Sequence, residues 1–126
     1  MLRRTLGLCL LACSFFAVGQ ERKLTIDSGA FLYEACQLRV KYMNDPNAKL
    51  DQSEVARSLM CDSYVNGFID GALASGGYCL QKVTREDAIR KYVAFMTEQP
   101  LLLKEDKMMS MALVLKPLFK CPAAVR

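Results

Sequence analysis

The fold of this 126-residue chain is decided by residues 51–77, which read DQSEVARSLMCDSYVNGFIDGALASGG. Asp51 followed by Glu54 is a capping-box pattern, which predicts that a helix begins here. Apolar residues then recur at helical spacing and predict one buried face, made of Val55, Leu59, Tyr64 with Val65, Phe68, Ile69 and Ala72. Gly76 and Gly77 end the pattern, because glycine readily adopts the left-handed backbone found at helix C-termini. The stretch therefore predicts one long helix.

Capping patterns predict two further helices, one on each side of this stretch. Ser28 precedes an apolar pattern at helical spacing, and the turn-forming residues 44–47 stop it. After the long helix, Thr84 with Asp87 predicts another helix start, and Pro100 ends that helix. The predicted apolar faces are Phe31, Leu32, Ala35, Leu38 and Val40 or Tyr42 in the first helix, and Ala88, Ile89, Tyr92, Val93 and Met96 in the later one.

A fourth helical pattern is predicted from about Leu103, and Pro117 should kink or end it. Its predicted buried face is Met108, Met111, Ala112 and Leu115. No stretch alternates apolar and polar residues for long enough to predict a strand. The predicted fold class is all-α, a small bundle of four to five helices arranged as two helical hairpins.

The first residues predict export. Two arginines lie within residues 1–4, an almost unbroken apolar run covers residues 5–18, and small side chains precede Gln20. This is the anatomy of a signal peptide that is cleaved before Gln20. The apolar run has about 14 residues, fewer than the about 20 that cross a bilayer, so no permanent membrane anchor is predicted. We predict a signal peptide over residues 1–19 and a single periplasmic domain over residues 20–126.

One alternative form of export is a lipoprotein, because residues 10–13 loosely resemble a lipobox with Cys13 as the lipidated residue.

Charge limits the predicted partners of the exported chain. Removal of Arg3 and Arg4 takes two from the formal net charge of +4 and leaves +2, and the remaining basic residues are scattered among acidic ones. A chain without a basic stripe is a poor match for nucleic acid, so no nucleic-acid partner is predicted.

Four cysteines remain after cleavage: Cys36, Cys61, Cys79 and Cys121. In an oxidising compartment they predict two disulfides. A zinc site is disfavoured, because no two of them have the close spacing of zinc motifs and the chain has no histidine. In the predicted hairpins the first two lie at similar distances from one turn, and the last two flank the other turn. The predicted pairing is Cys36–Cys61 and Cys79–Cys121, one of three possible connectivities.

Few residues are candidates for catalysis. Histidine, the commonest general base, is absent, and the cysteines are assigned to disulfides. The remaining candidates are the carboxylates Asp62, Asp70, Glu86, Asp87, Glu105 and Asp106. Each also fits an ordinary place at a helix start or on a solvent-facing surface. We predict no catalytic residue, no metal, no cofactor and no enzymatic activity, with an enzyme that uses carboxylates alone as the alternative.

Two other features can mark contact surfaces. Gly67 and Gly71 lie four residues apart on the long helix, where glycine costs about 0.5–1 kcal/mol relative to alanine. Close packing against the protein's own core is the predicted reason, and a partner interface is the alternative. The methionines of the fourth helix are predicted to fill the core, with Met109 as an exposed exception that marks a contact surface.

An ordered set of these features resembles a known family. Its elements are Cys36 in an early helix, residues 61–71 (CDSYVNGFIDG), Tyr78-Cys79, the helix start Val83-Thr84, Tyr92-Val93, Gln99-Pro100, and a late cysteine after Phe119. Together they span roughly residues 28–122 and resemble the Rap/Tai family of type VI secretion immunity proteins. The resemblance implies a small, helical, periplasmic protein that is often a homodimer. Such a protein binds a peptidoglycan amidase effector and sterically blocks its active-site groove with a protruding segment.

The segment predicted to touch a partner is residues 75–83, because it is polar, rich in glycine and anchored by a cysteine. Its predicted partner-binding residues are Ser75, Tyr78, Gln81 and Lys82. An ordinary connection between two helices is the competing interpretation. For the whole protein, the alternative function is a periplasmic structural or chaperone-like binding protein without a toxin partner.

Overall fold

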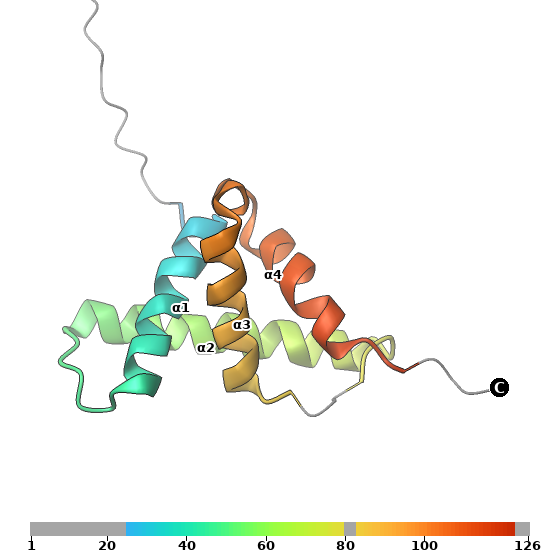
Figure 1. The fold of residues 1–126 in the computed structure, drawn as a ribbon, viewed down its shortest axis with the longest axis horizontal. Coiled ribbons are helices and arrows are strands. Elements are labelled where there is room, and N and C mark those ends of the chain that lie inside the picture. Colours follow the sequence, from blue (N-terminus) through green and yellow to red (C-terminus); the bar gives the residue numbers. More distant parts are fainter. Residues whose placement is uncertain (1–24, 80–82, 123–126) are drawn as a thin grey trace, which may run out of the picture.

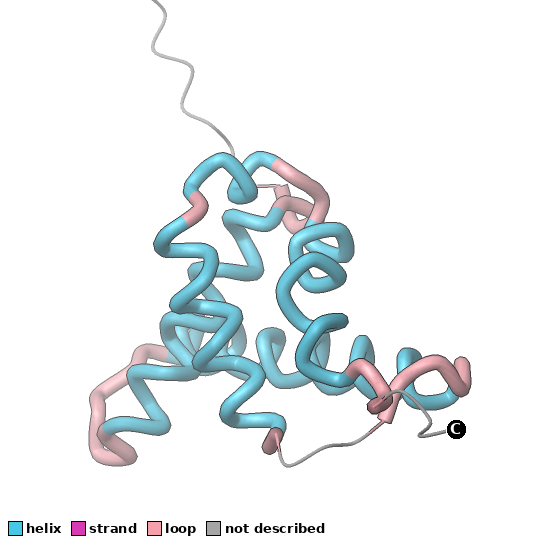
Figure 2. The backbone as a smooth tube through the Cα atoms, turned by 45° about the vertical axis from the view of Figure 1, so that its right-hand side comes forward, coloured by secondary structure: helices cyan, strands magenta, loops and turns pink. Residues whose placement is uncertain are grey.

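The computed structural model describes residues 25–79 and 83–122, which form helices joined by short loops. In chain order the elements are α1 (Gly29–Asn44), α2 (Gln52–Ala74), α3 (Arg85–Glu98), the 3₁₀-helix η1 (Pro100–Lys104), α4 (Lys107–Leu115) and the 3₁₀-helix η2 (Lys116–Phe119). Figure 1 shows α2 running across the base of the molecule, with α1, α3 and α4 standing over it. Figure 2 shows the helices and their connecting loops from another side, with no strand in the described part of the chain. The all-α prediction is confirmed.

Capping side chains confirm the three predicted helix starts. The Ser28 hydroxyl accepts a hydrogen bond from the backbone N–H three residues on, at 3.2 Å. Asp51 and Glu54 form a complete capping box with N···O distances of 2.9 and 2.8 Å, and Thr84 and Asp87 form another. The backbone N–H of Glu54 lowers the pKa of Asp51, and the Thr84 hydroxyl lowers the pKa of Asp87. In both boxes the hydrogen bond favours the ionised carboxylate.

The core lies where α1, α3 and α4 meet α2. Its buried apolar residues are Leu32, Ala35, Cys36, Cys61, Val65, Ile69, Ala88, Ile89, Tyr92, Met96, Met111, Val114, Leu115 and Phe119. Both predicted disulfides are confirmed. The Cys36–Cys61 disulfide is wholly buried in this core, whereas Cys79 and Cys121 are only half-buried, at one edge of the molecule.

The fourth helix and two positions of the second differ from prediction. Leu103 lies in η1, and the helix itself begins only at Lys107, after the side chain of Asp106 caps it. This start turns Met108 outward, where it is 49% exposed, so its predicted place in the core is wrong. Val55 and Leu59 of α2 are also exposed rather than buried, at 43% and 59%. Both residues border a depression that they share with Arg39 and Tyr42 of α1, so α1 covers them only in part.

Two polar residues of α4 point inward instead. The Lys107 ammonium donates to the Asp27 carboxylate at 2.9 Å and to the Tyr64 hydroxyl at 3.0 Å, and these bonds raise the pKa of Lys107. The Ser110 hydroxyl lies 2.8 Å from that of Tyr92, inside the core. Burial raises the pKa of Tyr92 to about 12. These hydrogen bonds satisfy the inward polar groups, as burial requires.

The start of α1 packs tightly against η1 and the residue that follows it. The backbone N–H of Gly29 donates to the carbonyl of Glu105 at 2.7 Å. A Cβ atom at Gly29 would lie 2.6 Å from the carbonyl oxygen of Leu102, closer than real Cβ atoms approach. Only glycine therefore fits this junction without movement of backbone.

Candidate functional site

The predicted partner-binding segment begins as a tight turn at the end of α2. The Ser75 hydroxyl donates to the carbonyl of Ala72 at 2.6 Å and helps to close the last helical turn. Gly76 follows with a φ of 74°, in the left-handed region that favours glycine. The chain then leaves α2 at the edge of the molecule opposite the α1–α2 turn (Figure 1). The Ser75 hydrogen bond and the left-handed backbone of Gly76 thus end α2 and turn the segment away from it.

Three links fix the segment where it passes η2. Tyr78 and Lys120 form an isolated antiparallel bridge. The backbone N–H of Cys79 donates to the carbonyl of Phe119 at 2.8 Å, and Cys79 is joined to Cys121 by the second disulfide. The Tyr78 side chain also packs against the core from the side. The end of the chain therefore holds the described part of the segment in one conformation.

A cleft of about 510 Å³ lies between the segment and η2. It is lined by Gly77, Tyr78, Lys116, Pro117 and Lys120. Two ammonium groups near a tyrosine ring give it a basic rim and an apolar wall. Such a lining suits a partner surface that combines carboxylates with apolar atoms.

The structure brings together part of the predicted site. Tyr78 lines the cleft, and Ser75 is exposed nearby on the turn but does not line it. Gln81 and Lys82 lie outside the described residues. The opposite wall, residues 116–120, was not predicted as part of the site. The predicted second disulfide was the signal that could have found it, because that bond brings the residues before its second cysteine beside the segment.

Comparison with protein families is decisive for the class of protein. The model of the Rap1a immunity proteins matches residues 28–121, from the cap of α1 to the last cysteine of the second disulfide. The chain belongs to the Rap1a immunity family. The resemblance to Rap/Tai immunity proteins is thereby confirmed, and membership indicates an immunity protein that acts against a bacterial effector. No curated protein and no solved structure matches the chain.

Most of the carboxylates considered for catalysis have structural roles in this Rap1a family member. Asp62 and Asp70 form ion pairs with arginines, at 2.8 and 2.5 Å. Asp87 and Asp106 cap α3 and α4. The two glutamates of the set are exposed at helix starts. Within the residues that the structure describes, no cluster of three or more histidine, cysteine, aspartate or glutamate side chains is placed to hold a metal ion.

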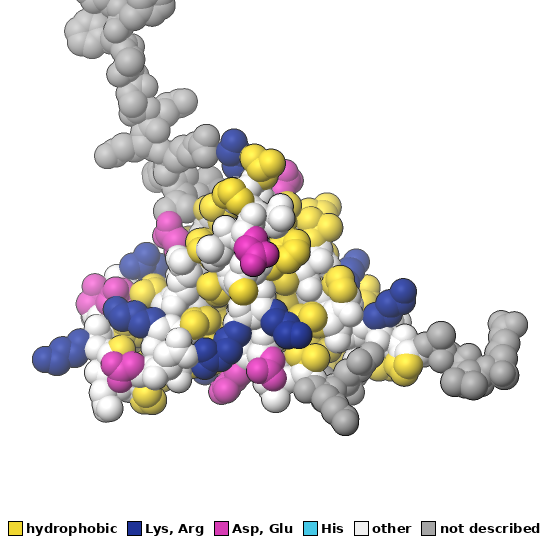
Figure 3. Space-filling view, viewed as in Figure 1, with side chains coloured by type: hydrophobic (Ala, Val, Ile, Leu, Met, Phe, Trp, Pro, Cys, Tyr) yellow, Lys and Arg dark blue, Asp and Glu magenta, His cyan; other side chains and the backbone are white. Residues whose placement is uncertain are grey.

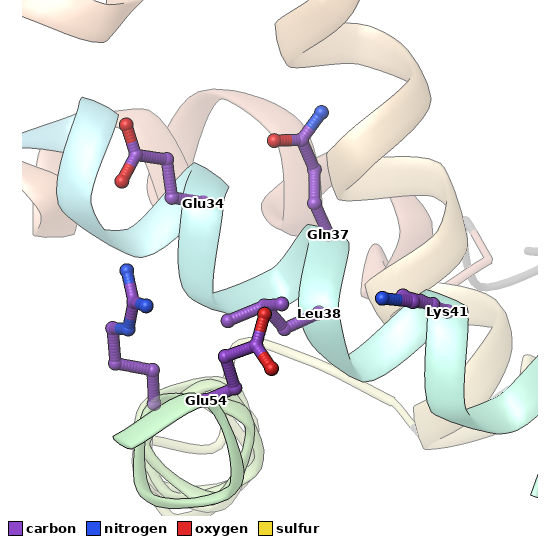
Figure 4. A pocket seen from close by; sticks show the side chains of 6 residues that line it. Glu34, Gln37, Leu38, Lys41 and Glu54 are labelled. Carbon is purple, nitrogen blue, oxygen red and sulfur yellow. The ribbon is translucent and has the colours of Figure 1, made fainter. Parts of the chain in front are cut away.

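A second depression lies between α1 and α2 and is polar (Figure 4). It has a volume of about 340 Å³ and is lined by Glu34, Gln37, Leu38, Lys41, Glu54 and Arg57. Two acidic and two basic side chains balance its charge. The Glu54 carboxylate also accepts the backbone N–H of Asp51 in the capping box. The depression thus lacks the concentrated charge of a binding site for a charged ligand.

The outer face of α2 contradicts the explanation predicted for its glycines. A Cβ atom added at Gly67 or Gly71 would meet nothing within 4 Å, and both residues are exposed. Close packing against the protein's own core is therefore wrong as the reason for them. Nearer the start of α2, exposed Val55 and Leu59 border an apolar depression of about 220 Å³ together with exposed Tyr42 of α1. This Rap1a family member leaves one side of its longest helix open.

Proposed function

We propose that this protein is a periplasmic immunity protein that binds a peptidoglycan amidase effector of a type VI secretion system. Inhibition would be steric: residues 75–83 and the adjoining cleft occupy the substrate groove of the amidase and keep peptidoglycan out. The proposed contacts are Ser75, Tyr78, Gln81 and Lys82 on the segment, and Lys116 and Lys120 on the opposite wall of the cleft.

The observation that carries this proposal is the fixed position of Tyr78 beside the basic cleft. The bridge to Lys120, the bond from Cys79 to the carbonyl of Phe119 and the second disulfide hold Tyr78 and Cys79 before any partner arrives. A segment that is already ordered loses little conformational entropy on binding, so more of its contact energy appears as affinity. The described residues 75–79, which are partly exposed, held in place and chemically mixed, support a role in recognition.

The proposed periplasmic location is supported by the two disulfides, which persist in oxidising compartments. Within residues 25–79 and 83–122, no helix is long and apolar enough to cross a membrane. The predicted signal peptide, residues 1–19, and the alternative lipidation site at Cys13 lie outside the described residues. Fractionation of cells that produce the full chain, with mass spectrometry of the mature N-terminus, distinguishes free export from lipidation.

The inhibition is tested with the cognate amidase, which is to be sought as a cysteine–histidine amidase gene beside the gene for this protein. We expect the oxidised protein to bind this amidase and to stop its release of fragments from purified peptidoglycan. The double variant Tyr78→Ala/Lys116→Ala should inhibit at least about ten-fold more weakly, because it removes an aromatic anchor and a charge from the centre of the contact. Lys41→Ala, at an exposed lysine on α1, is the control.

Two results would contradict different parts of the proposal. Unchanged inhibition by the double variant would show that the site lies elsewhere. A wild-type protein that leaves the amidase fully active would refute the function itself. The same assay without amidase tests the proposed absence of catalysis, since fragments released by the immunity protein alone would show that it is an enzyme.

A second candidate function is a chaperone-like binding protein, and the outer face of α4 favours it. Met108, Met109 and Leu113 are each about half exposed there. A chaperone would suppress the light scattering of a heat-unfolded client protein at substoichiometric amounts, and an immunity protein would not. The family match favours the immunity role.

A further inference from the structure

The two disulfides differ in whether a reagent can reach them. Cys79 and Cys121 are each half-buried at one edge of the molecule, whereas Cys36 and Cys61 are completely buried in the core. A disulfide is broken by a thiolate that reaches one of its two sulfur atoms. A thiolate can therefore attack the second disulfide in the folded protein, whereas attack on the first requires the core to open.

The second disulfide also closes a very short pairing of two chain segments. Tyr78 and Lys120 form one isolated antiparallel bridge, and each cysteine directly follows one member of that bridge. The backbone N–H of Cys79 donates to the carbonyl of Phe119 at 2.8 Å. One such bridge is weak without a covalent link, because even a complete two-stranded hairpin is only marginally stable in water. The position of Tyr78 and Cys79 thus depends on the disulfide more than on the bridge.

The opposite side of this pairing is held independently of the second disulfide. Phe119 is 2% exposed and belongs to the core, and η2 follows directly after α4. The Cys36–Cys61 disulfide joins α1 to α2 whether or not the second disulfide is intact. Reduction of the second disulfide would therefore release Tyr78 and Cys79 and leave the core and the η2 wall of the cleft in place.

The charge near the second disulfide favours its reaction with a thiolate. The residues that precede its two cysteines, Tyr78 and Lys120, both line the basic cleft, together with Lys116. Both lysines are exposed, and Figure 3 shows basic side chains at the edge of the molecule beside α4. Positive charge attracts the incoming thiolate and stabilises the thiolate that leaves.

We propose that the Cys79–Cys121 disulfide is a site of thiol–disulfide exchange with a dithiol oxidoreductase, and that its reduction releases Tyr78. One thiolate of the oxidoreductase attacks the sulfur of Cys79 or Cys121, the bond between the two cysteines breaks, and the other cysteine leaves as a thiolate and takes up a proton. The second thiol of the oxidoreductase then attacks the mixed disulfide and frees the first cysteine. The oxidoreductase ends as a disulfide, and the cysteine pair has gained two electrons and two protons.

The consequence for the effector rests on the proposed function, because Tyr78 is one of the proposed contacts with the amidase. In the oxidised protein this side chain is in place before binding. In the reduced protein it has to be ordered during binding, and that loss of conformational entropy weakens the affinity. The two oxidation states thus share one fold and differ in their affinity for the effector.

The first test uses the exported, oxidised protein without any effector. A reduced thioredoxin-type dithiol protein is added, free thiols are alkylated at intervals, and mass spectrometry locates them. We expect Cys79 and Cys121 to be alkylated about 100-fold faster than Cys36 and Cys61, because reduction of the buried pair waits for the core to open. Hydrogen exchange at the Cys79 backbone N–H should become at least about ten-fold faster after reduction, with circular dichroism unchanged.

The second test measures the affinity for the cognate amidase by calorimetry, after the reductant is removed. The reduced protein should bind at least about ten-fold more weakly than the oxidised protein, and re-oxidation should restore the affinity. The matched control is Cys79→Ala/Cys121→Ala. This variant should bind as weakly as the reduced protein and should not respond to the reductant.

Several results would overturn the proposal. They are reduction of both disulfides at the same rate, resistance of both, loss of the folded circular-dichroism signal on reduction, and unchanged hydrogen exchange at Cys79. A reduced protein that binds the amidase as tightly as the oxidised one would overturn the proposed consequence for the effector. An oxidised protein that does not bind the amidase would instead refute the proposed function and leave the exchange site standing on the first test.

Discussion

The two disulfides close loops of different length and lie in different surroundings. Cys36 and Cys61, separated by 25 residues, join the middles of α1 and α2 and are completely buried. Cys79 and Cys121, separated by 42 residues, join two loops at an edge of the molecule and are only half-buried. The first disulfide is part of the packing that forms the core. The second holds a surface segment against the end of the chain.

This difference separates two contributions to stability. Restriction of the unfolded chain alone would stabilise the protein by about 3.5 kcal/mol for the shorter loop and about 4 kcal/mol for the longer one. Loop length thus favours the disulfide at the edge slightly. Packing favours the buried disulfide, because its sulfur atoms fill space inside the core. The buried disulfide therefore stabilises the protein more only if the effect of core packing is larger than the effect of loop length.

The largest expected effect is loss of the buried disulfide. Cys36→Ala/Cys61→Ala should lower the free energy of unfolding by about 4–6 kcal/mol, since it adds an internal cavity to the loss of the loop constraint. Cys79→Ala/Cys121→Ala should lower it by only about 2–3 kcal/mol, because the exposed edge can relax. Urea unfolding of both variants measures the difference. An edge variant that is as unstable as the core variant would mean that loop length dominates.

The next effect contrasts glycines at an interior junction and at the edge. Gly29→Ala should destabilise the protein by about 2–3 kcal/mol, because the new Cβ would overlap the Leu102 carbonyl and force backbone to move. The control is Gly77→Ala at the edge, where the nearest atom to a new Cβ is the Ser75 hydroxyl at 4.0 Å. Thermal unfolding of the two variants tests this. Equal melting temperatures would show that the junction is loose.

A third effect is confined to the core and depends on pH. The pKa of Tyr92 is raised from 10.0 to about 12 in the folded protein. The neutral phenol therefore contributes stability that is fully present below pH 10 and is lost as the pH rises through about 12. The loss should be roughly 2–3 kcal/mol, at 1.4 kcal/mol for each pKa unit.

Tyr92→Phe should remove this pH dependence, at the expense of the hydrogen bond to Ser110. Urea unfolding at about pH 8.5, below the titration, and at about pH 11.5, where most of the loss has occurred, measures the difference between variant and wild type. Tyr42→Phe, at an exposed tyrosine on α1, is the control. If the wild type and Tyr92→Phe lost the same stability at high pH, the phenol would not be buried as the structure places it.

The smallest expected effect is a gain in stability on the open face of α2. Gly67→Ala and Gly71→Ala should each stabilise the protein by about 0.5–1 kcal/mol, because a Cβ at either position meets no neighbour and alanine favours the helix. Thermal unfolding measures the gain, with Gly29→Ala as the contrasting interior substitution. A loss of stability at either position would indicate that this face is covered, for example by another molecule.

The sequence predicted the helix starts well because a capping box depends on neighbouring residues. Ser28, Asp51 and Thr84 each cap a helix as expected. The start of α4 was missed, because the leucines after Pro100 continue a helical pattern that the chain instead forms as a 3₁₀-helix. The inward place of Lys107 depends on partners more than 40 residues away, which no local pattern contains.

The candidate site was only partly predictable for the same reason. Tyr78 was found because it lies in an exposed segment beside a cysteine. The facing wall, Lys116 to Lys120, comes from another part of the chain and meets the segment only through packing and the second disulfide. Similarly, Val55 and Leu59 have the spacing of a buried face but lie at the border of a depression that α1 leaves open.

The contact between Lys107 and Asp27 indicates where a label or tether can be attached without blocking the Tyr78 segment. It ties the first described residues to the start of α4, at the end of the molecule away from the Tyr78 segment (Figure 1). The last described residue, Pro122, lies directly after Cys121 and therefore beside that segment. A fluorophore, affinity tag or surface tether placed before Thr25 would leave the segment accessible to a partner, whereas the same group placed after Pro122 would stand next to it.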